Sequence, residues 1–297
     1  MKHLFFSLVF FFVVTTSLQS EEKYSPLVST QWLAEHLHDE NLVVLQLAQI
    51  RNDYKKGHIP GARFFWTNWF AMSNPDLNFE LLPVAHLDSI VEILGISNNS
   101  RIVIVFSGIS VSQATRVFAT FDYLGMSERT SFLDGGFEQW KKEGREVSTD
   151  IPKVSKGNFT PKLHEDVFVG VDWMKEHINS PSVQIVDARA PQFYNGTSKQ
   201  YTRDGHIPSA KNIYYNTLFD STNKVLPLDT LKKIFATAGV TTNEIATYCH
   251  VGQTASAVYF ISRYLGLKAH LYDGSYEEWN SRDDLPFEVT KVDSVKK

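Results

Sequence analysis

Cys249, the single cysteine of this 297-residue chain, is the side chain best suited to nucleophilic chemistry. It directly follows a short strand predicted over residues 244–248 and precedes an amphipathic helix predicted over residues 255–265. Because a helix N-terminus and a turn of backbone N–H groups stabilise an anion, this position favours the thiolate. The alternative is a buried, inert cysteine at the end of a strand.

The loop between this strand and this helix consists of His250, Val251, Gly252, Gln253 and Thr254. Gly252 allows the loop to turn without the steric cost of a Cβ atom. Thr254 is predicted to be the N-cap of the helix, with a hydroxyl that can also face the sulfur. For His250 two roles stay open: either it tunes the thiolate or attracts an anionic substrate, or it faces solvent.

Three charged side chains elsewhere in the second half of the chain are candidates for supporting roles. Asp187 and Arg189 follow a short strand predicted to begin at Val183, and we expect them to pair and order the adjoining loop rather than to take part in the chemistry. Arg203 is a candidate for binding an anionic substrate, and the alternative is a solvated surface arginine. One cysteine and scattered histidines lack ligand spacing, so no metal site is predicted.

The two halves of the chain repeat one another. The segment Gly57-His-Ile-Pro60 recurs as Gly205-His-Ile-Pro208. Further along, Leu133-Asp-Gly-Gly-Phe-Glu-Gln-Trp140 recurs as Tyr272-Asp-Gly-Ser-Tyr-Glu-Glu-Trp279, in the same order along the chain. This repetition indicates a tandem duplication.

The duplication predicts two domains, at residues 24–145 and 166–290. The connection between them, residues 146–165, lacks hydrophobic periodicity, as a linker does. In each half short apolar strands alternate with helical segments, which is typical of an α/β fold with a parallel sheet flanked by helices. Ligands of such sheets bind at the carboxyl ends of the strands, where Cys249 is predicted to lie.

The repeated Gly-His-Ile-Pro segments, the cysteine loop and the Asp-Gly-x-x-x-x-Trp turns resemble the two-domain rhodanese family of sulfurtransferases over the whole of residues 24–290. The resemblance implies that Cys249 accepts a sulfane sulfur as a persulfide and passes it to a thiophilic acceptor, with no metal or organic cofactor. Related phosphatases end a longer loop in an arginine that binds phosphate. Here the first arginine after Cys249 is Arg263, which argues against phosphate chemistry.

The first half lacks a nucleophile. Ser107 follows a strand predicted over residues 102–106, at about the position that Cys249 has in the second half, and it has no histidine and carboxylate to activate it. The strand segment Leu45–Ala48 contains neither an acid nor a base. We therefore expect the first domain to be a structural support that walls the cleft.

The sequence offers two candidate sulfur donors. His250 and Val251 match neither the basic loops of thiosulfate-using relatives nor the loops of mercaptopyruvate-using relatives, and Phe193 stands where the family often has an arginine. The lost arginine disfavours the larger donor, so we expect thiosulfate as the donor and a thiol or cyanide as the acceptor. The alternatives are a 3-mercaptopyruvate sulfurtransferase and a non-catalytic sulfur-carrier or binding module.

Composition excludes other classes of protein. With 43% hydrophobic residues the chain can bury a core, and 29 basic against 33 acidic residues leave no basic excess for nucleic acid. Residues 1–20, with an apolar run from Leu4 to Val14, are typical of a signal peptide. We therefore expect an exported monomer without a membrane anchor after cleavage, periplasmic in a Gram-negative bacterium and otherwise secreted.

Overall fold

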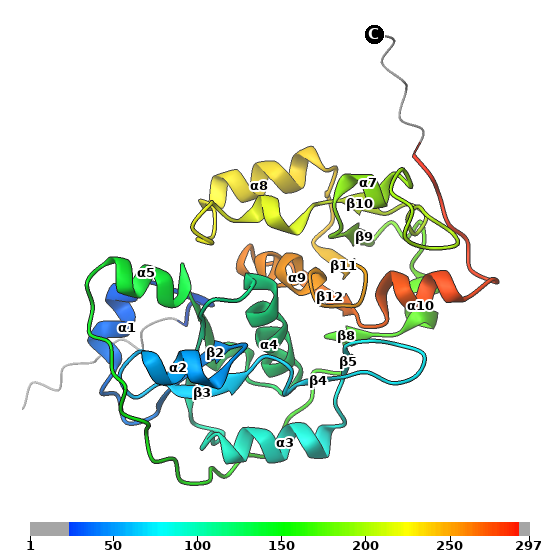
Figure 1. Ribbon diagram of the computed structural model, residues 1–297. Helices are drawn as coiled ribbons and strands as arrows, with labels where there is room; N and C mark the ends of the chain where they lie inside the picture. The colour runs from blue at the N-terminus through cyan, green and yellow to red at the C-terminus, as the bar shows by residue number, and fades with distance from the viewer. Residues whose placement is uncertain (1–23, 291–297) are drawn as a thin grey trace, which may run out of the picture.

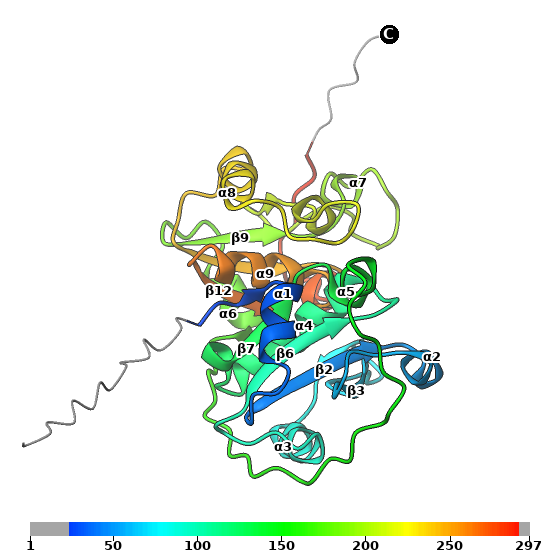
Figure 2. The ribbon, with the colours of Figure 1, turned by 90° about the vertical axis from the view of Figure 1, so that its left-hand side faces the viewer.

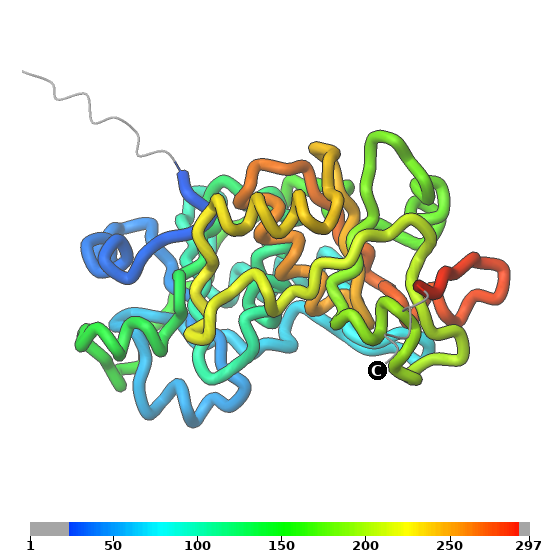
Figure 3. Tube along the Cα trace, turned by 90° about the horizontal axis from the view of Figure 1, so that it is seen from above, coloured from blue at the N-terminus to red at the C-terminus, as the bar shows by residue number. Residues whose placement is uncertain are grey.

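The computed structural model describes residues 24–290, so the predicted signal peptide lies outside the described residues. Within this range the chain forms two α/β halves, each built on a five-stranded parallel sheet. The halves lie side by side (Figures 1 and 3). The predicted fold class is confirmed. None of the helices described is long and apolar enough to cross a membrane.

The first half has the strand order β1, β7, β6, β2, β3. Its sheet strands are β1 Leu27–Val28, β2 Leu42–Ala48, β3 Arg63–Trp66, β6 Arg101–Phe106 and β7 Thr130–Leu133. Its helices are α1 Thr30–His36, α2 Arg51–Lys56, α3 Val84–Ile93, α4 Val111–Tyr123, the 3-10 helix η1 Ser127–Arg129 and α5 Gly136–Lys142. A small antiparallel hairpin, β4 Ala71–Met72 and β5 Glu80–Leu81, stands apart from this sheet.

The second half has the strand order β10, β9, β11, β12, β8. Its strands are β8 Phe168–Val169, β9 Val183–Asp187, β10 Lys211–Asn212, β11 Glu244–Tyr248 and β12 Lys268–Tyr272. Its helices are α6 Val171–Glu176, α7 Pro191–Tyr194, the 3-10 helix η2 Tyr215–Leu218, α8 Leu228–Thr237, α9 Ala255–Tyr264 and α10 Ser275–Ser281. The strand and the helix predicted on either side of the cysteine loop are thereby confirmed.

The two sheets correspond strand by strand. In chain order β1, β2, β3, β6 and β7 are equivalent to β8, β9, β10, β11 and β12, and the two sheets place these strands in the same sequence across the sheet. The repeated Asp-Gly turns and the hydrogen-bond registers also fix residue equivalence. They pair Ile104 with Thr247, Phe106 with Cys249 and Gln46 with Asp187.

Strand β6 illustrates how sequence determines the layers. Its Ile102, Ile104 and Phe106 belong to a core shared with α3 and α4, while Val103 and Val105 belong to a second core shared with α1 and α5. Because helices cover both faces of a parallel sheet, the residues of its central strand are apolar on both faces. The second sheet is covered in the same way, by α8 and α9 on one face and by α6 and α10 on the other.

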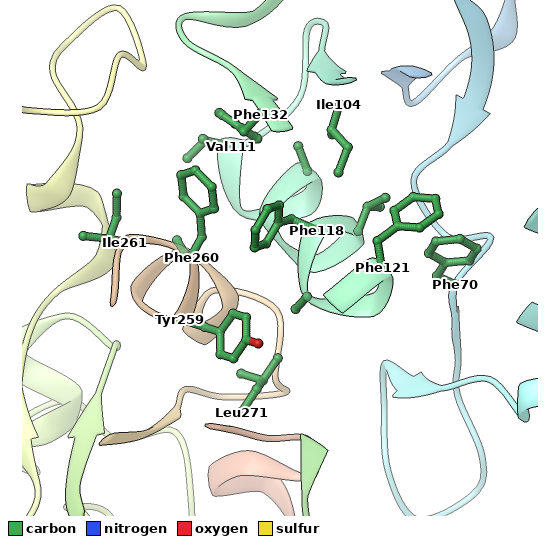
Figure 4. Close-up of a cluster of buried hydrophobic side chains, with 14 of the residues drawn as sticks. Phe70, Ile104, Val111, Phe118, Phe121, Phe132, Tyr259, Phe260, Ile261 and Leu271 are labelled. Atoms are coloured by element: carbon green, nitrogen blue, oxygen red, sulfur yellow. The ribbon is translucent and has the colours of Figure 1, made fainter. Parts of the chain in front are cut away.

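The two halves meet through α4 and α9, which lie between the sheets (Figure 2). Phe118 of α4 and Phe260 of α9 pack edge to face with their ring centroids 4.9 Å apart (Figure 4). Beside them, the buried Asp122 accepts a hydrogen bond from the Tyr259 hydroxyl at 2.7 Å and pairs with Arg263 at 3.1 Å. One hydrophobic core therefore extends through both halves and reaches the helix that follows the cysteine loop.

Candidate active site

Cys249 lies at the carboxyl end of β11, the middle strand of the second sheet. Its side chain is free and only 1% exposed. Its backbone N–H donates to Oγ of Ser275 at 3.1 Å, and its carbonyl accepts from the N–H of Tyr276 at 3.0 Å. Both partners stand at the beginning of α10, which thus holds the backbone of the cysteine.

Residues 250–254 present uncommitted donors next to Cys249. Among residues 24–290, no acceptor is hydrogen bonded to the backbone N–H groups of this segment. Gly252 has φ of +74°, and a Cβ atom there would lie 2.6 Å from the carbonyl oxygen of Asp273, so the predicted need for glycine is explained. Thr254 occupies the N-cap position of α9, but its side chain makes no capping hydrogen bond, contrary to expectation.

Asp187 and Arg189 form the expected pair at the end of β9. Nη2 of Arg189 lies 2.6 Å from Oδ2 of Asp187, and both side chains are buried. The same nitrogen donates to the carbonyl of Gly205 at 2.6 Å, and Asp187 also accepts from the Tyr248 hydroxyl at 2.8 Å. Burial by itself would lower the pKa of Arg189, but the adjacent carboxylate raises it, so the guanidinium stays charged.

His250 is uncharged at neutral pH. Burial, reinforced by the positive charge of Arg189, lowers the pKa of His250 to about 4. Its Nδ1 lies 3.0 Å from the hydroxyl of Tyr201, and its ring meets that of Phe193 edge to face at 4.7 Å. His250 therefore lies among aromatic side chains, and the suggested attraction of an anion by a protonated imidazole does not operate at neutral pH.

Arg203 has a different role from the one considered for it. Its guanidinium donates at 2.6–3.3 Å to backbone carbonyls between α10 and the C-terminal segment, those of Trp279, Asn280, Arg282 and Leu285. These hydrogen bonds use four of the five N–H groups of the guanidinium, which leaves no pair of donors for an anionic substrate. The expectation that Arg203 binds the substrate is therefore corrected: it ties down the chain after α10.

Sequence reasoning missed Arg116, which the first half contributes to the site. This arginine lies in α4, is 2% exposed and pairs with Asp273 at 2.6 Å. It also donates to the carbonyl of Gly252, in the cysteine loop, at 3.3 Å. Arg116 is the one basic residue of α4, but this was a weak indication, because Asp273 and Gly252 lie in the other half of the sequence.

Sequence reasoning also missed Ser275, although the repeats differ there: the first reads Asp-Gly-Gly and the second Asp-Gly-Ser. Ser275 is fully buried and has φ of +52°, a backbone conformation that residues other than glycine rarely adopt. Its hydroxyl accepts the Cys249 N–H and donates to the carbonyl of Tyr272 at 2.9 Å. A strained backbone at a buried site is typical of functional positions.

The equivalent position in the first half is filled by a phenyl ring. Phe106, which corresponds to Cys249, is 2% exposed, and Gly136 corresponds to Ser275. A Cβ atom on Gly136 would lie 2.6 Å from the carbonyl oxygen of Phe106 and 2.8 Å from its ring, so a serine does not fit there. Ser107 stands one residue later, at the position of His250, which resolves the one-residue uncertainty of the sequence alignment.

The arginines named above are all committed to other groups of the protein. Arg189 is bound to Asp187, Arg116 to Asp273 and Arg203 to backbone carbonyls. For an anion the site therefore offers the N–H groups of residues 250–254 rather than one of these guanidinium groups. In the described part of the chain, no group of three or more His, Cys, Asp or Glu side chains is arranged to hold a metal ion.

Comparison with known proteins assigns both halves of the chain to one family of domains. The family model described as "Rhodanese-like domain" matches residues 29–143 and again residues 170–282. The chain is 30% identical over 295 residues to thiosulfate/3-mercaptopyruvate sulfurtransferase 2 of Arabidopsis thaliana, covering 88% of this chain and 86% of that protein. It is 30% identical over 281 residues to the sulfur carrier protein TtuD of Thermus thermophilus, covering 88% and 95%.

The fold of this chain also matches solved structures whose sequences are less similar to it. The anaerobic ergothioneine biosynthesis enzyme from Chlorobium limicola superposes with a TM-score of 0.79 at 20% identity, over 91% of this chain and 72% of that one. At this identity the comparison shows a shared fold. Together with the two matches to the family model, it leads to one conclusion: the chain belongs to the rhodanese family, with one rhodanese-like domain in each half.

Proposed function

We propose that the protein is a sulfurtransferase in which Cys249 carries the sulfur as a persulfide. The thiolate attacks the outer sulfur of thiosulfate, the S–S bond breaks, and sulfite leaves with the bonding electron pair. Cyanide or a thiolate then attacks the terminal sulfur and takes it as thiocyanate or an organic persulfide. The second step regenerates the Cys249 thiolate.

The observation that carries this proposal is the position of Cys249 at the end of β11, directly before a segment whose N–H groups have no acceptor within residues 24–290. Such donors stabilise both a thiolate and a persulfide anion, without a metal or an organic cofactor. The relatives named as thiosulfate and 3-mercaptopyruvate sulfurtransferases support the same class of reaction.

We propose thiosulfate as the donor and 3-mercaptopyruvate as the second candidate. Thiosulfate is a small anion that a turn of backbone N–H groups can surround. Mercaptopyruvate presents a carboxylate and a carbonyl that call for paired arginines, and Phe193 occupies the position expected to supply one of them. Arg203 is engaged by backbone carbonyls and His250 is neutral, so neither residue offers a positive charge to thiosulfate or to mercaptopyruvate.

A second candidate function is that of a non-catalytic sulfur carrier or binding module. The specific observation in its favour is the same commitment of Arg203 and Arg189 to partners within the protein. The relative named as a sulfur carrier protein supports this hypothesis as well. A carrier loads sulfur on Cys249 but does not turn over with small acceptors.

Steady-state kinetics with thiosulfate and with 3-mercaptopyruvate, each with cyanide as the acceptor, separate these functions. The proposal predicts thiocyanate production with a higher kcat/KM for thiosulfate. A preference for mercaptopyruvate would overturn the choice of donor but keep the persulfide reaction. Sulfur loading without turnover would favour the carrier, and no loading with either donor would overturn the persulfide.

We also propose that the protein is exported as a monomer. The pattern of residues 1–20, a short basic start followed by an apolar run and small polar residues, supports export. N-terminal sequencing of protein from the periplasm or the medium should show a cut near residue 20, and light scattering should give the mass of one chain. Full-length protein confined to the cytosol would contradict export.

A further inference from the structure

Arg116 makes contacts with four separate segments. From α4 of the first domain its guanidinium reaches Oδ1 of Asp273 at 2.6 Å, the carbonyl of Gly252 at 3.3 Å and the carbonyl of Phe79 at 3.2 Å. Its Cζ also lies 4.7 Å from the centre of the Phe168 ring. The first domain thus places one rigid, planar group of donors beside the cysteine loop of the second.

We infer that Arg116 is a positioning residue which sets the geometry of the cysteine loop, residues 249–254, for sulfur transfer. The inference rests on the proposed function of Cys249. Its first step is the contact with Gly252. In a trans peptide unit the C=O of one residue and the N–H of the next point in opposite directions. By holding the carbonyl of Gly252, Arg116 fixes the direction of the Gln253 N–H.

The direction of this N–H bears on the reaction, because Gln253 belongs to the segment of uncommitted donors that follows Cys249. A rotation of the peptide unit between residues 252 and 253 would replace a donor by a carbonyl oxygen, which repels an anion. Gly252, with φ of +74°, has few steric restraints of its own to prevent such a rotation. Arg116 supplies the missing restraint.

The second step is the contact with Asp273. This residue directly precedes the turn in which Ser275 accepts the Cys249 N–H. Its Oδ1 meets Arg116, and its Oδ2 accepts the N–H of Leu81 at 2.9 Å. Arg116 therefore fixes two segments relative to each other: the loop that supplies the donors and the turn that holds the backbone of the cysteine.

Joining the two domains does not by itself require this arrangement. Arg263 and Asp122 already form an ion pair across the interface, with Arg263 about one-third exposed. Arg116 is buried at a cost, since within residues 24–290 its Nε and Oε1 of the neighbouring Glu80 have no hydrogen-bond partner. Oδ1 of Asp273 also lacks a hydrogen bond of good geometry, so its contact with Arg116 at 2.6 Å is an ion pair. A buried ion pair is a poor source of stability, so its position at the loop indicates a role in geometry.

The test compares Arg116→Lys and Arg116→Met with the matched control Arg263→Met, which also loses an ion pair between the domains but does not touch the loop. Lysine keeps a charge for Asp273, yet one ammonium group cannot reproduce the planar fork that also holds Gly252 and Phe79. Three kinds of measurement are made: thermal stability, steady-state kinetics (kcat and KM) with thiosulfate and cyanide, and hydrogen exchange of the N–H groups of Cys249 and Tyr276.

For both Arg116 variants we expect kcat to fall about tenfold or more, with KM changed by less than about threefold, because misplaced donors act on the reacting sulfur. Exchange of the Cys249 and Tyr276 N–H groups should accelerate about tenfold, since their hydrogen bonds open more often. Arg263→Met should change neither the kinetic constants nor the exchange rates. Arg116→Lys decides the matter if Arg116→Met does not fold.

The inference is overturned if the Arg116 variants lose stability as Arg263→Met does but keep the wild-type kcat and the wild-type exchange rates. It is also overturned if KM rises while kcat is unchanged, because Arg116 would then act on binding alone. Failure of the proposed function is a separate result: the wild-type protein would produce no thiocyanate, and hydrogen exchange would still test the role of Arg116.

Discussion

The two domains satisfy the same pair of backbone groups in different ways. In the first domain Gln46 acts alone. Its Oε1 accepts the N–H of Ile59 at 3.0 Å, and its Nε2 donates to the carbonyl of Gly57 at 3.5 Å. One neutral amide thus orders the Gly-His-Ile-Pro segment of this domain.

In the second domain three side chains share this task. The N–H of Ile207 donates to the Tyr248 hydroxyl at 3.1 Å, and the carbonyl of Gly205 accepts from Arg189 at 2.6 Å. Asp187, at the position of Gln46, accepts hydrogen bonds from both Tyr248 and Arg189. A buried network with two charges replaces the single amide.

This difference teaches that ordering the segment does not require an ion pair. Burying two charges is costly, and an amide performs the same task in the first domain. What the ion pair adds is a guanidinium near the site: Cζ of Arg189 lies 4.0 Å from the centre of the Tyr276 ring, and its charge helps to lower the pKa of His250. The second domain has kept or gained charge where it has a nucleophile.

The largest effect that distinguishes the domains is expected at the nucleophile. Cys249→Ser should abolish thiocyanate production, because a serine hydroxyl neither ionises nor forms a persulfide at neutral pH. Ser107→Ala, at the position of His250 in the first domain, should leave kcat/KM unchanged. A loss of activity in Ser107→Ala without unfolding would show that the first domain is more than a support.

The next largest effect is on stability. Asp187→Ala leaves Arg189 buried without its partner and should lower the free energy of unfolding by about 3–5 kcal/mol. Gln46→Ala leaves an unpaired backbone N–H at Ile59 and should cost about 1–3 kcal/mol. Denaturant titration of both variants gives the comparison. Equal losses would mean that the ion pair and the amide contribute alike.

Replacing the charged network of the second domain by the amide of the first separates the effect on stability from the effect on catalysis. The double variant Asp187→Gln/Arg189→Ala introduces the amide of the first domain into the second. We expect it to be more stable than Asp187→Ala, since no unpaired charge remains, but to have a kcat/KM about tenfold below wild type because the guanidinium is missing. Full activity of this variant would restrict the pair to ordering the segment.

The smallest effect concerns pH. In the unfolded chain His250 titrates near about 6.5, whereas its pKa in the folded protein is about 4. Between these values the unfolded state binds more protons, so stability from this group is present above pH 6.5 and is lost as the pH falls towards 4. His250→Gln should remove about 1–2 kcal/mol of this dependence, allowing for partial exposure. Unchanged pH dependence would contradict the buried, neutral imidazole.

The sequence was sufficient to predict the tandem α/β fold and the position of Cys249. Buried parallel strands such as β6 carry apolar runs, and Gly252 stands three residues after the cysteine where φ is positive, so both features depend on local pattern. The pairing of Asp187 with Arg189 is also local, since a single residue separates them at the end of one strand.

Features that depend on contacts between distant segments could not be predicted in this way. Arg116 reaches the cysteine loop only because α4 packs against α9, and Arg203 donates to carbonyls 76–82 residues later in the sequence. Neither partner can be inferred from hydrophobic pattern or residue type. The neutrality of His250 likewise follows from burial beside Arg189, which is set by the tertiary fold.

The central claim is that the second domain alone carries sulfur and does so on Cys249. Mass spectrometry of the intact protein tests it most directly. Intact wild-type protein incubated with thiosulfate and freed of excess donor should gain the mass of one sulfur atom, located by peptide mapping on Cys249 and removed by cyanide. Cys249→Ser should gain nothing. Added sulfur on the serine variant, or none on the wild type with either donor, would contradict the account.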